Sequence, residues 1–156
     1  MASGNYICDK VQRAITAYLQ GQTFTRIASS AIYKGIQRTP ASTASALTER
    51  SNPRIECICQ RATAENQSFV DGCWIATVTV RIVDNADDAT DDQHHADVAE
   101  VLAVLVTDTI AADLSTALAD FTAFLVTPQD QTWEIAGRSW VGQLSFQVHC
   151  VGSDIS

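Results

Sequence analysis

The stretch WVGQLSFQVHC at residues 140–150 is the clearest indication of the fold. Its apolar side chains recur at every second position with mostly polar side chains between them, which is the pattern of a β-strand that buries one face. Residues 73–83 alternate in the same way, and residues 54–62 form a third such strand in which Cys57 and Cys59 share a side. These three segments predict a sheet with one apolar and one polar face.

Weaker strand patterns flank these three segments. Residues 23–36 mix Thr, Ile, Ser, Tyr and Phe, and they predict an irregular strand. Residues 122–127 predict another strand, which we expect to end at Pro128, because proline cannot donate a hydrogen bond to a neighbouring strand. Residues 131–136 predict a last short strand before the one at 140–150.

Two segments show the periodicity of amphipathic helices. Residues 5–19 place apolar side chains three to four residues apart, and Gly21 follows as a stop signal. Residues 91–120 carry a longer apolar stripe, formed by Val98, Leu102, Val106, Ile110, Leu114 and Leu118 and widened by Val101 and Leu105.

The second helix has a clear start and an expected break. Thr90 and Gln93 fit a capping box, in which each residue caps the backbone of the other. One uninterrupted helix would be about 45 Å long, and residues 107–109 (Thr-Asp-Thr) are weak helix formers. We therefore expect a break near 108–113 and a short second piece that runs to about residue 120.

The order of these elements predicts a single α+β domain over residues 1–156. We expect a mostly antiparallel sheet of about four to five strands with two main helices packed on one face. Residues 37–53 interrupt the pattern with six Ser or Thr, three Ala and two Pro. This flexible segment is either a surface loop or an arm that orders against a neighbouring molecule.

The composition excludes several classes of protein. Hydrophobic residues make up 46% and charged residues 18% of the 156, which is too apolar for a chain that is disordered throughout. No window approaches the roughly 18 uncharged apolar residues of a membrane helix, and the first residues lack the order of a secretory signal. We therefore expect no membrane partner and a protein that stays in the compartment where it is made.

The sequence contains no recognisable catalytic or cofactor-binding motif. The sequence lacks a glycine-rich phosphate loop and a serine nucleophile elbow. The five cysteines, at positions 8, 57, 59, 73 and 150, match no zinc pattern, so we expect five reduced thiols, no metal site and no cofactor. We expect His94 and His95 to lie at the surface or at the helix start rather than in a catalytic site.

The acidic run at residues 84–92 is the most conspicuous feature of the chain. Five of its nine residues are aspartates, but the alternation and the central glycine of an EF-hand loop are missing. We therefore expect a solvated turn that caps a helix, with weak binding of a divalent cation as the alternative.

The ordered combination of these segments resembles a known family. It comprises PRIEC at 53–57, GCWIATVTV at 72–80, the acidic turn, the His94-His95 pair and the strand at 140–150. Over most of residues 50–150 it resembles the tail terminator (tail completion, minor tail protein U-like) proteins of long-tailed bacteriophages. The resemblance implies a small α+β virion protein without catalytic residues, assembled in the host cytoplasm.

The same resemblance implies how such a protein works. The subunits form a ring, expected to be a hexamer, on the finished tail tube at its head-proximal end. The ring stops polymerisation of the tube protein and presents a surface to the head-side connector protein. Genomic DNA passes through the channel without specific binding.

The charge distribution indicates how copies in such a ring meet. Residues 1–61 contain eight bases and three acids, a net charge of +5, whereas residues 62–156 contain two bases and fifteen acids, a net charge of −13. The overall charge of −8 makes the chain a poor candidate for gripping nucleic acid. Ring contacts join two different patches, so we expect bases of one copy to face acids on an exposed turn of the next: Arg38, Arg50 and Arg54 against Asp84, Asp87, Asp88, Asp91 and Asp92.

Three alternatives stay open on the sequence alone. In the first, the acidic turn lines the central channel rather than contacting a neighbouring subunit, and it prevents the passing DNA from binding. The subunit instead belongs to a head–tail connector or stopper ring. From another class, the chain is a small α+β ligand-binding or hydrolytic domain that uses Cys or His, which a convergent pocket with perturbed titratable groups would favour.

Overall fold

The structure is a computed structural model that describes residues 6–35, 53–64 and 73–152. Nearly all of the segment expected to be flexible, residues 37–53, lies outside these ranges. The elements within them are, in chain order, α1 (Ile7–Gln20), the 3-10 helix η2 (Ser29–Ala31), β1 (Ile32–Lys34), β2 (Arg54–Ala64), β3 (Cys73–Asn85), α3 (Asp91–Leu105), α4 (Ile110–Ala117), β4 (Phe121–Ala136) and β5 (Ser139–Gly152).

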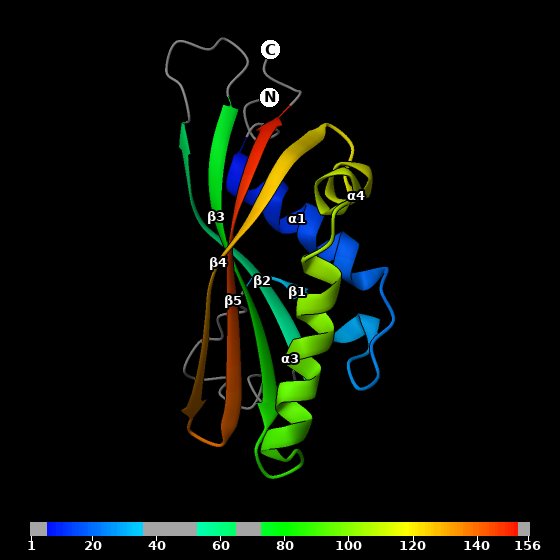
Figure 1. The fold of residues 1–156 in the computed structure, drawn as a ribbon, viewed down its shortest axis with the longest axis vertical. Coiled ribbons are helices and arrows are strands. Elements are labelled where there is room, and N and C mark those ends of the chain that lie inside the picture. The colour runs from blue at the N-terminus through cyan, green and yellow to red at the C-terminus, as the bar shows by residue number, and fades with distance from the viewer. Residues whose placement is uncertain (1–5, 36–52, 65–72, 153–156) are drawn as a thin grey trace, which may run out of the picture.

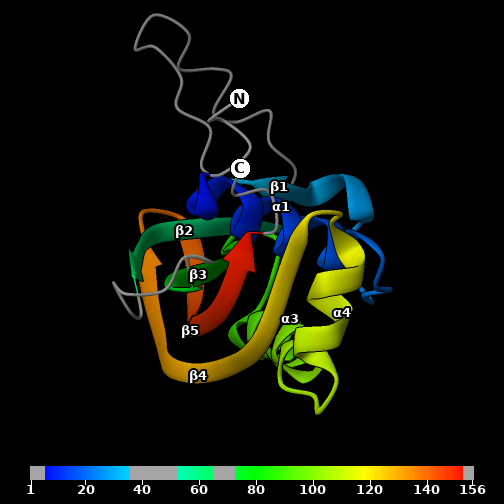
Figure 2. The same ribbon diagram turned by 90° about the horizontal axis from the view of Figure 1, so that it is seen from above.

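The strands form a five-stranded sheet in the order β1-β2-β3-β5-β4. Strand β1 runs parallel to β2, and the other neighbouring pairs are antiparallel. Figure 1 shows long, strongly twisted strands with the helices on one side, and Figure 2 shows the sheet curving toward those helices. The predicted α+β class, with a mostly antiparallel sheet and helices on one face, is confirmed.

The two central strands form the floor of the core. Strand β3 pairs with β5 along its whole length, so that Val78 lies opposite Phe146 and Val80 opposite Leu144. Burial of one such side chain stabilises the fold by about 1.5–3 kcal/mol. The alternation predicted for both strands is confirmed, because the inward side chains are buried: Ala76, Val78, Val80 and Ile82 on β3, and Leu144, Phe146, Val148 and Cys150 on β5.

Helix α1 packs on this floor and reaches two other elements. Val11, Ala14 and Leu19 on its inner face are fully buried. Lys10 is also buried, and its Nζ donates to the carbonyl oxygen of Asp120 at 3.0 Å, so the aliphatic stem packs in the core while the charged end keeps a partner. The hydroxyl of Tyr18 donates to the carbonyl oxygen of Val104, at 2.6 Å, and ties α1 to α3.

The predicted start of the long helix is confirmed. The Gln93 backbone N–H donates to Thr90 Oγ1 at 3.2 Å, and the Thr90 N–H donates to Gln93 Oε1 at 2.9 Å. The expected break is also present, although it comes earlier than 108–113, between the end of α3 and the start of α4. Because the chain turns there, Val106 leaves the predicted stripe and is 50% exposed, and the buried line of α3 is His94, Asp97, Val101 and Leu105.

Two strand predictions are wrong in detail. Strand β4 runs unbroken through Pro128, because register shifts after Ala123 and after Pro128 accommodate the proline in a strand at the edge of the sheet. Of residues 23–36, the described part (23–35) does not form one long strand; it forms a loop, η2 and the three-residue β1. Two hydroxyl groups of this segment bond to helices instead: Ser29 Oγ donates to the Gln20 carbonyl of α1, and Thr25 Oγ1 donates to Glu100 Oε2 of α3.

All five cysteines are free. Cys57 and Cys59 lie on the buried side of β2, as their spacing predicted. Burial raises the pKa of the Cys57 thiol to about 12, so the group stays protonated at neutral pH. These cysteines behave as small apolar side chains of the core.

Candidate functional site

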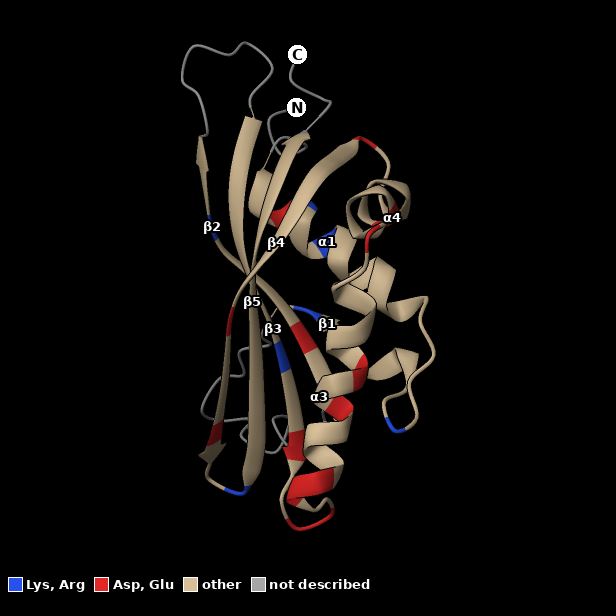
Figure 3. Cartoon of the chain, in the orientation of Figure 1, with Lys and Arg blue, Asp and Glu red and all other residues tan. Residues whose placement is uncertain are grey.

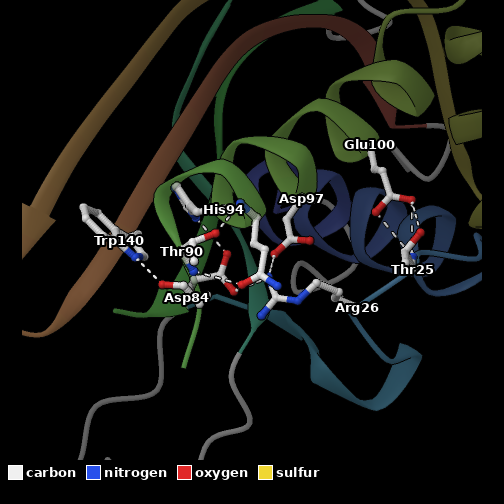
Figure 4. Close-up of polar contacts among 10 residues, drawn as sticks. Thr25, Arg26, Asp84, Thr90, His94, Asp97, Glu100 and Trp140 are labelled. Atoms are coloured by element: carbon white, nitrogen blue, oxygen red, sulfur yellow. Dashed lines mark hydrogen bonds and ion pairs between the residues drawn. The ribbon is translucent and has the colours of Figure 1, made fainter. Parts of the chain in front are cut away.

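A buried polar cluster joins β3, α3 and the loop after α1 (Figure 4). Asp84, near the end of β3, and His94, in the first turn of α3, are fully buried, and His94 Nδ1 lies 2.8 Å from Asp84 Oδ2. Arg26 Nη1 lies 3.2 Å from Asp84 Oδ1 and 2.5 Å from Asp97 Oδ2. Asp97 is 1% exposed, so the cluster meets solvent chiefly through the side chain of Arg26, which is 26% exposed.

The sheet below the cluster is shaped to let α3 approach. A Cβ at Gly142 of β5 would lie 2.7 Å from Val98 Cγ2 and 3.3 Å from His94 Nε2, closer than side-chain atoms ordinarily come. Within the described residues this Nε2 is a buried atom without a hydrogen-bond partner. The glycine therefore allows close packing of the helix on β5 at this point.

The two carboxyl groups of the cluster have opposite pKa shifts. Burial, together with the hydrogen bond and negative charge of Asp84, raises the pKa of Asp97 to about 7. Burial opposes ionisation of Asp84 as well, but hydrogen bonds from His94 and Asp97 and the charge of Arg26 outweigh it and lower the pKa of Asp84. Between the lowered pKa of Asp84 and about pH 7, the pair therefore holds one proton and one negative charge.

At this cluster the sequence prediction for Asp84 is wrong, and that for His94 is met in part. Asp84 does not lie on an exposed turn, because it continues the inward alternation of β3 two residues after Ile82. His94 lies at the helix start, one of the two places expected for it, but it is buried rather than at the surface, because it occupies the buried line of α3 above Asp84. The alternation of β3 was a usable signal for Asp84, whereas nothing in the sequence pattern marked Arg26 as the partner of both acids.

The other four acids of the run are exposed where α3 begins, at one tip of the molecule (Figure 3). Asp87 Oδ2 lies 3.5 Å from Arg138 Nη1 in the turn between β4 and β5, and both side chains are more than half exposed. Asp91 Oδ1 lies 3.2 Å from His95 Nε2. Exposed pairs of this kind contribute about 0–1 kcal/mol. Asp87, Asp88, Asp91 and Asp92 thus have the exposure that a contact with a neighbour requires.

Of the three bases expected to face these acids in a neighbouring copy, only Arg54 lies in the described residues, and it pairs within its own chain. Arg54 Nε lies 3.2 Å from Glu56 Oε2 in its own chain, and Arg81 Nη1 lies 3.1 Å from the other oxygen of the same carboxylate. Glu56 is 2% exposed, so loss of either arginine would leave a buried charge with less compensation. Arg38 and Arg50 lie outside the described residues. The structure thus gives Arg54 a role inside the subunit, and its contact with a neighbour stays a prediction.

A stack of three rings joins the start of α3 to the hairpin of β4 and β5. The centroids of His95 and Trp133 are 5.8 Å apart, and those of Trp133 and Trp140 are 5.6 Å apart. Trp140 is anchored by a 3.0 Å hydrogen bond from its Nε1 to the carbonyl oxygen of Ala89. Trp133 nevertheless keeps 44% of its surface exposed, and Ile135 keeps 57%. This half of β4 therefore presents apolar surface to solvent.

Two small hollows lie between α3 and β4. One has a volume of about 240 Å³, and its only charged lining residue is Asp130. The other has a volume of about 210 Å³ and borders the ring stack at His95 and Trp133. Neither is lined by Asp84, His94 or Asp97, so the perturbed titratable groups of the subunit do not open into these hollows.

The described part of the chain offers neither a metal site nor a membrane helix. In residues 6–35, 53–64 and 73–152, no group of three or more His, Cys, Asp or Glu side chains is placed to hold a metal ion. The helices of these ranges include none long and apolar enough to cross a bilayer.

Comparisons with known proteins give a likeness of fold. No family model matches the chain, and no curated protein matches it. A chain of the solved structure "Virion of native gene transfer agent (GTA) particle" superposes with a TM-score of 0.60 at 12% sequence identity. The match covers 97% of this chain and 98% of that chain. The two chains therefore share a fold from end to end.

Proposed function

We propose that this protein is a structural subunit of a phage or phage-like virion, and specifically a tail terminator. The observation that carries the proposal is the likeness to a chain of a gene transfer agent virion, which spans nearly the whole of both chains. The sequence resemblance to tail terminators of long-tailed bacteriophages supports the same assignment independently. A subunit of this kind acts by binding its neighbours.

In this proposal the subunits form a ring, most simply of six copies, on the last ring of the tail tube. One side of the ring blocks further addition of tube protein, and the other side binds the head-side connector. The net charge of −8 suits a channel through which DNA moves, because anionic protein surface does not bind phosphate. The exposed acids at the start of α3 supply part of that charge.

The pair formed by Asp84 and His94 is one candidate site for the hydrolytic alternative, which uses Cys or His. These side chains are within hydrogen-bond distance, as in acid–base sites, but both are 0% exposed. A substrate has no path to them in this arrangement, and the cluster instead joins three elements of the fold. We therefore propose no catalytic role for it.

Deletion of the gene tests the proposal. Virions made without the protein should have tails of uncontrolled length, because nothing stops the tube from growing. Tails of normal length that stay separate from filled heads would instead favour the connector or stopper ring. Complementation with the wild-type gene is the control, and normal, infectious particles from the deletion strain would contradict both assignments.

A further inference from the structure

Among the described residues, both edges of the sheet are open over part of their length. Strand β1 covers only the start of β2, where its three residues pair with Ile55, Glu56 and Cys57. In the described part of the chain, no strand pairs with the outer edge of residues 58–64. Strand β4 forms the other edge of the sheet, and within the described ranges it pairs only with β5.

Side chains of the helices bond to part of each edge. Ser115 of α4 accepts from the Ala123 N–H at 2.9 Å and donates to the Ala123 carbonyl at 3.1 Å, which satisfies the outer edge of β4 near its start. Gln12 of α1 accepts from the Cys59 N–H at 2.9 Å, so within residues 58–64 the stretch of β2 left for pairing is 60–64. Among the described residues, no helix or loop forms a backbone hydrogen bond to the outer edge of residues 127–136. An unpaired strand edge of this length is a template for pairing with another chain.

The chemistry of the two open edges is complementary. Residues 127–136 carry two acids, Asp130 and Glu134, and no base. Residues 58–64 carry Arg61 and no acid, and Arg61 is exposed and forms no ion pair with another described residue. Opposite charges on paired strands stabilise the pairing and guide the approach.

The apolar surfaces beside the two edges also match. Trp133 and Ile135 pair with Gly142 and Trp140, so they stand on the face of the sheet that carries the helices. On the same face, a hollow of about 430 Å³ adjoins the open edge of β2, and its lining includes Tyr6, Ala62 and Trp74. This volume falls within the range of about 300–1,000 Å³ in which proteins bind compact apolar groups.

We propose that the outer edge of β4 at residues 127–136 in one copy pairs with the outer edge of β2 at residues 60–64 in a second copy. Trp133 and Ile135 then cover the hollow beside β2, and Arg61 faces Asp130 and Glu134. Figure 1 shows these two edges at opposite ends of the long axis of the molecule. Each copy offers both halves of the contact, so the contact is heterologous, which is the type that builds a ring when the rotation between copies closes. This inference rests on the proposed function and names the surfaces through which the ring forms.

Charge reversal in the full-length chain tests the contact, with sedimentation velocity over a range of concentrations as the readout. Arg61→Glu should raise the dissociation constant of the assembly by about three- to tenfold, since one exposed attraction becomes a repulsion. Asp130→Lys with Glu134→Lys should have a similar effect. The three changes together should restore assembly to within about twofold of the wild type, because the reversed charges again attract. Asp108→Lys, an exposed acid between α3 and α4, is the matched control and should assemble normally.

Each result decides the question. Unchanged assembly of Arg61→Glu and of the double lysine variant would overturn the edge contact while leaving a ring subunit in place. Weakening without rescue in the triple variant would place these residues in different contacts and also overturn it. A wild-type chain that is monomeric at every concentration would overturn the contact, whereas the tail length of the deletion strain judges the proposed function separately. Arg61→Ala answers the same question if Arg61→Glu does not fold, which circular dichroism would show.

Discussion

Two groups of aspartates within fourteen residues of the chain have opposite surroundings. Asp84 and Asp97 are at most 1% exposed and share the guanidinium of Arg26, whereas Asp87 and Asp88 are exposed on the turn between them. The residue type is the same in both groups, and only the position on strand, turn or helix differs. The comparison shows that register on a buried face, rather than local charge density, decides whether a carboxylate holds the fold together or is free to meet a partner.

The largest expected effect is the loss of stability when a buried aspartate, rather than an exposed one, is replaced. Asp84→Ala leaves Arg26 and His94 facing an unfilled buried site, and we expect it to lower the free energy of unfolding by about 3–5 kcal/mol. Asp88→Ala should stay within about 0.5 kcal/mol of the wild type. Urea unfolding followed by circular dichroism measures both, and equal stabilities would show that the buried cluster does not hold the elements together.

The pH dependence of stability sharpens the same comparison. The pKa of Asp97 rises from its ordinary value of 3.8, which applies to the unfolded chain, to about 7 in the folded chain. Between these values the folded state holds a proton that the unfolded state has lost, so stability falls as pH rises through this window and levels off above it. The lowered pKa of Asp84 acts in the opposite sense only at lower pH, where stability is lost as that carboxylate becomes protonated.

Asp97→Asn should remove this contribution, because the amide keeps hydrogen-bonding capacity but does not titrate. The difference in unfolding free energy between wild type and variant should change by at most about 1.4 kcal/mol per pH unit between about pH 4 and 7. Asp91→Asn, on the exposed part of the same helix, is the control. Parallel stability curves for the wild type and Asp97→Asn would contradict a protonated Asp97 in the folded state.

The fold was largely predictable because the central strands and the two helical segments are amphipathic. Period-two alternation identified β3 and β5, and the weak helix formers near Asp108 indicated the break between α3 and α4. Strand β4 was divided wrongly at Pro128, because a proline at a sheet edge with a register shift looks in sequence like a strand end. Local patterns thus identified the helices and strands, but they did not show that pairing with β5 lets β4 continue through Pro128.

The candidate site was less predictable, since it depends on tertiary contacts. The alternation of β3 already placed Asp84 beside Ile82 on the inner face, but the acidic run around it favoured a solvated turn. Arg26 lies in a loop without periodicity, so its contacts with both acids follow only from the packing of α3. The open edges of β2 and β4 likewise follow from strand order, which no local pattern contains.

Loss of the helix cap at Thr90 should have a smaller effect on the free energy of unfolding. Thr90→Ala removes the side chain that accepts the Gln93 N–H, and we expect a loss of about 1 kcal/mol in the free energy of unfolding. Thr109 stands at the start of α4 without a capping hydrogen bond to the backbone, so Thr109→Ala should change stability by only a few tenths of that. Similar losses in both variants, measured by thermal unfolding, would argue against the capping box as the stabilising element.

The smallest expected effect concerns the exposed acids alone. Asp87→Lys with Asp88→Lys should leave the subunit folded and weaken ring assembly by no more than about 1 kcal/mol per pair, more at low salt than at high salt. Such a result would support the pairing of this turn with bases of a neighbour, for which Arg38, Arg50 and Arg54 are the predicted candidates. Unchanged assembly at both salt concentrations, measured by light scattering, would instead place the turn on the channel wall.

Cryo-electron microscopy of the native particle tests the central claim most directly. The proposed function predicts a ring of six copies of this fold between the last ring of the tail tube and the head-side connector. The edge contact inferred above predicts, in addition, continuous strand pairing from β4 of each copy to β2 of the next. A particle in which this position is filled by a different fold, or in which the chain is absent, would contradict the assignment as a tail terminator.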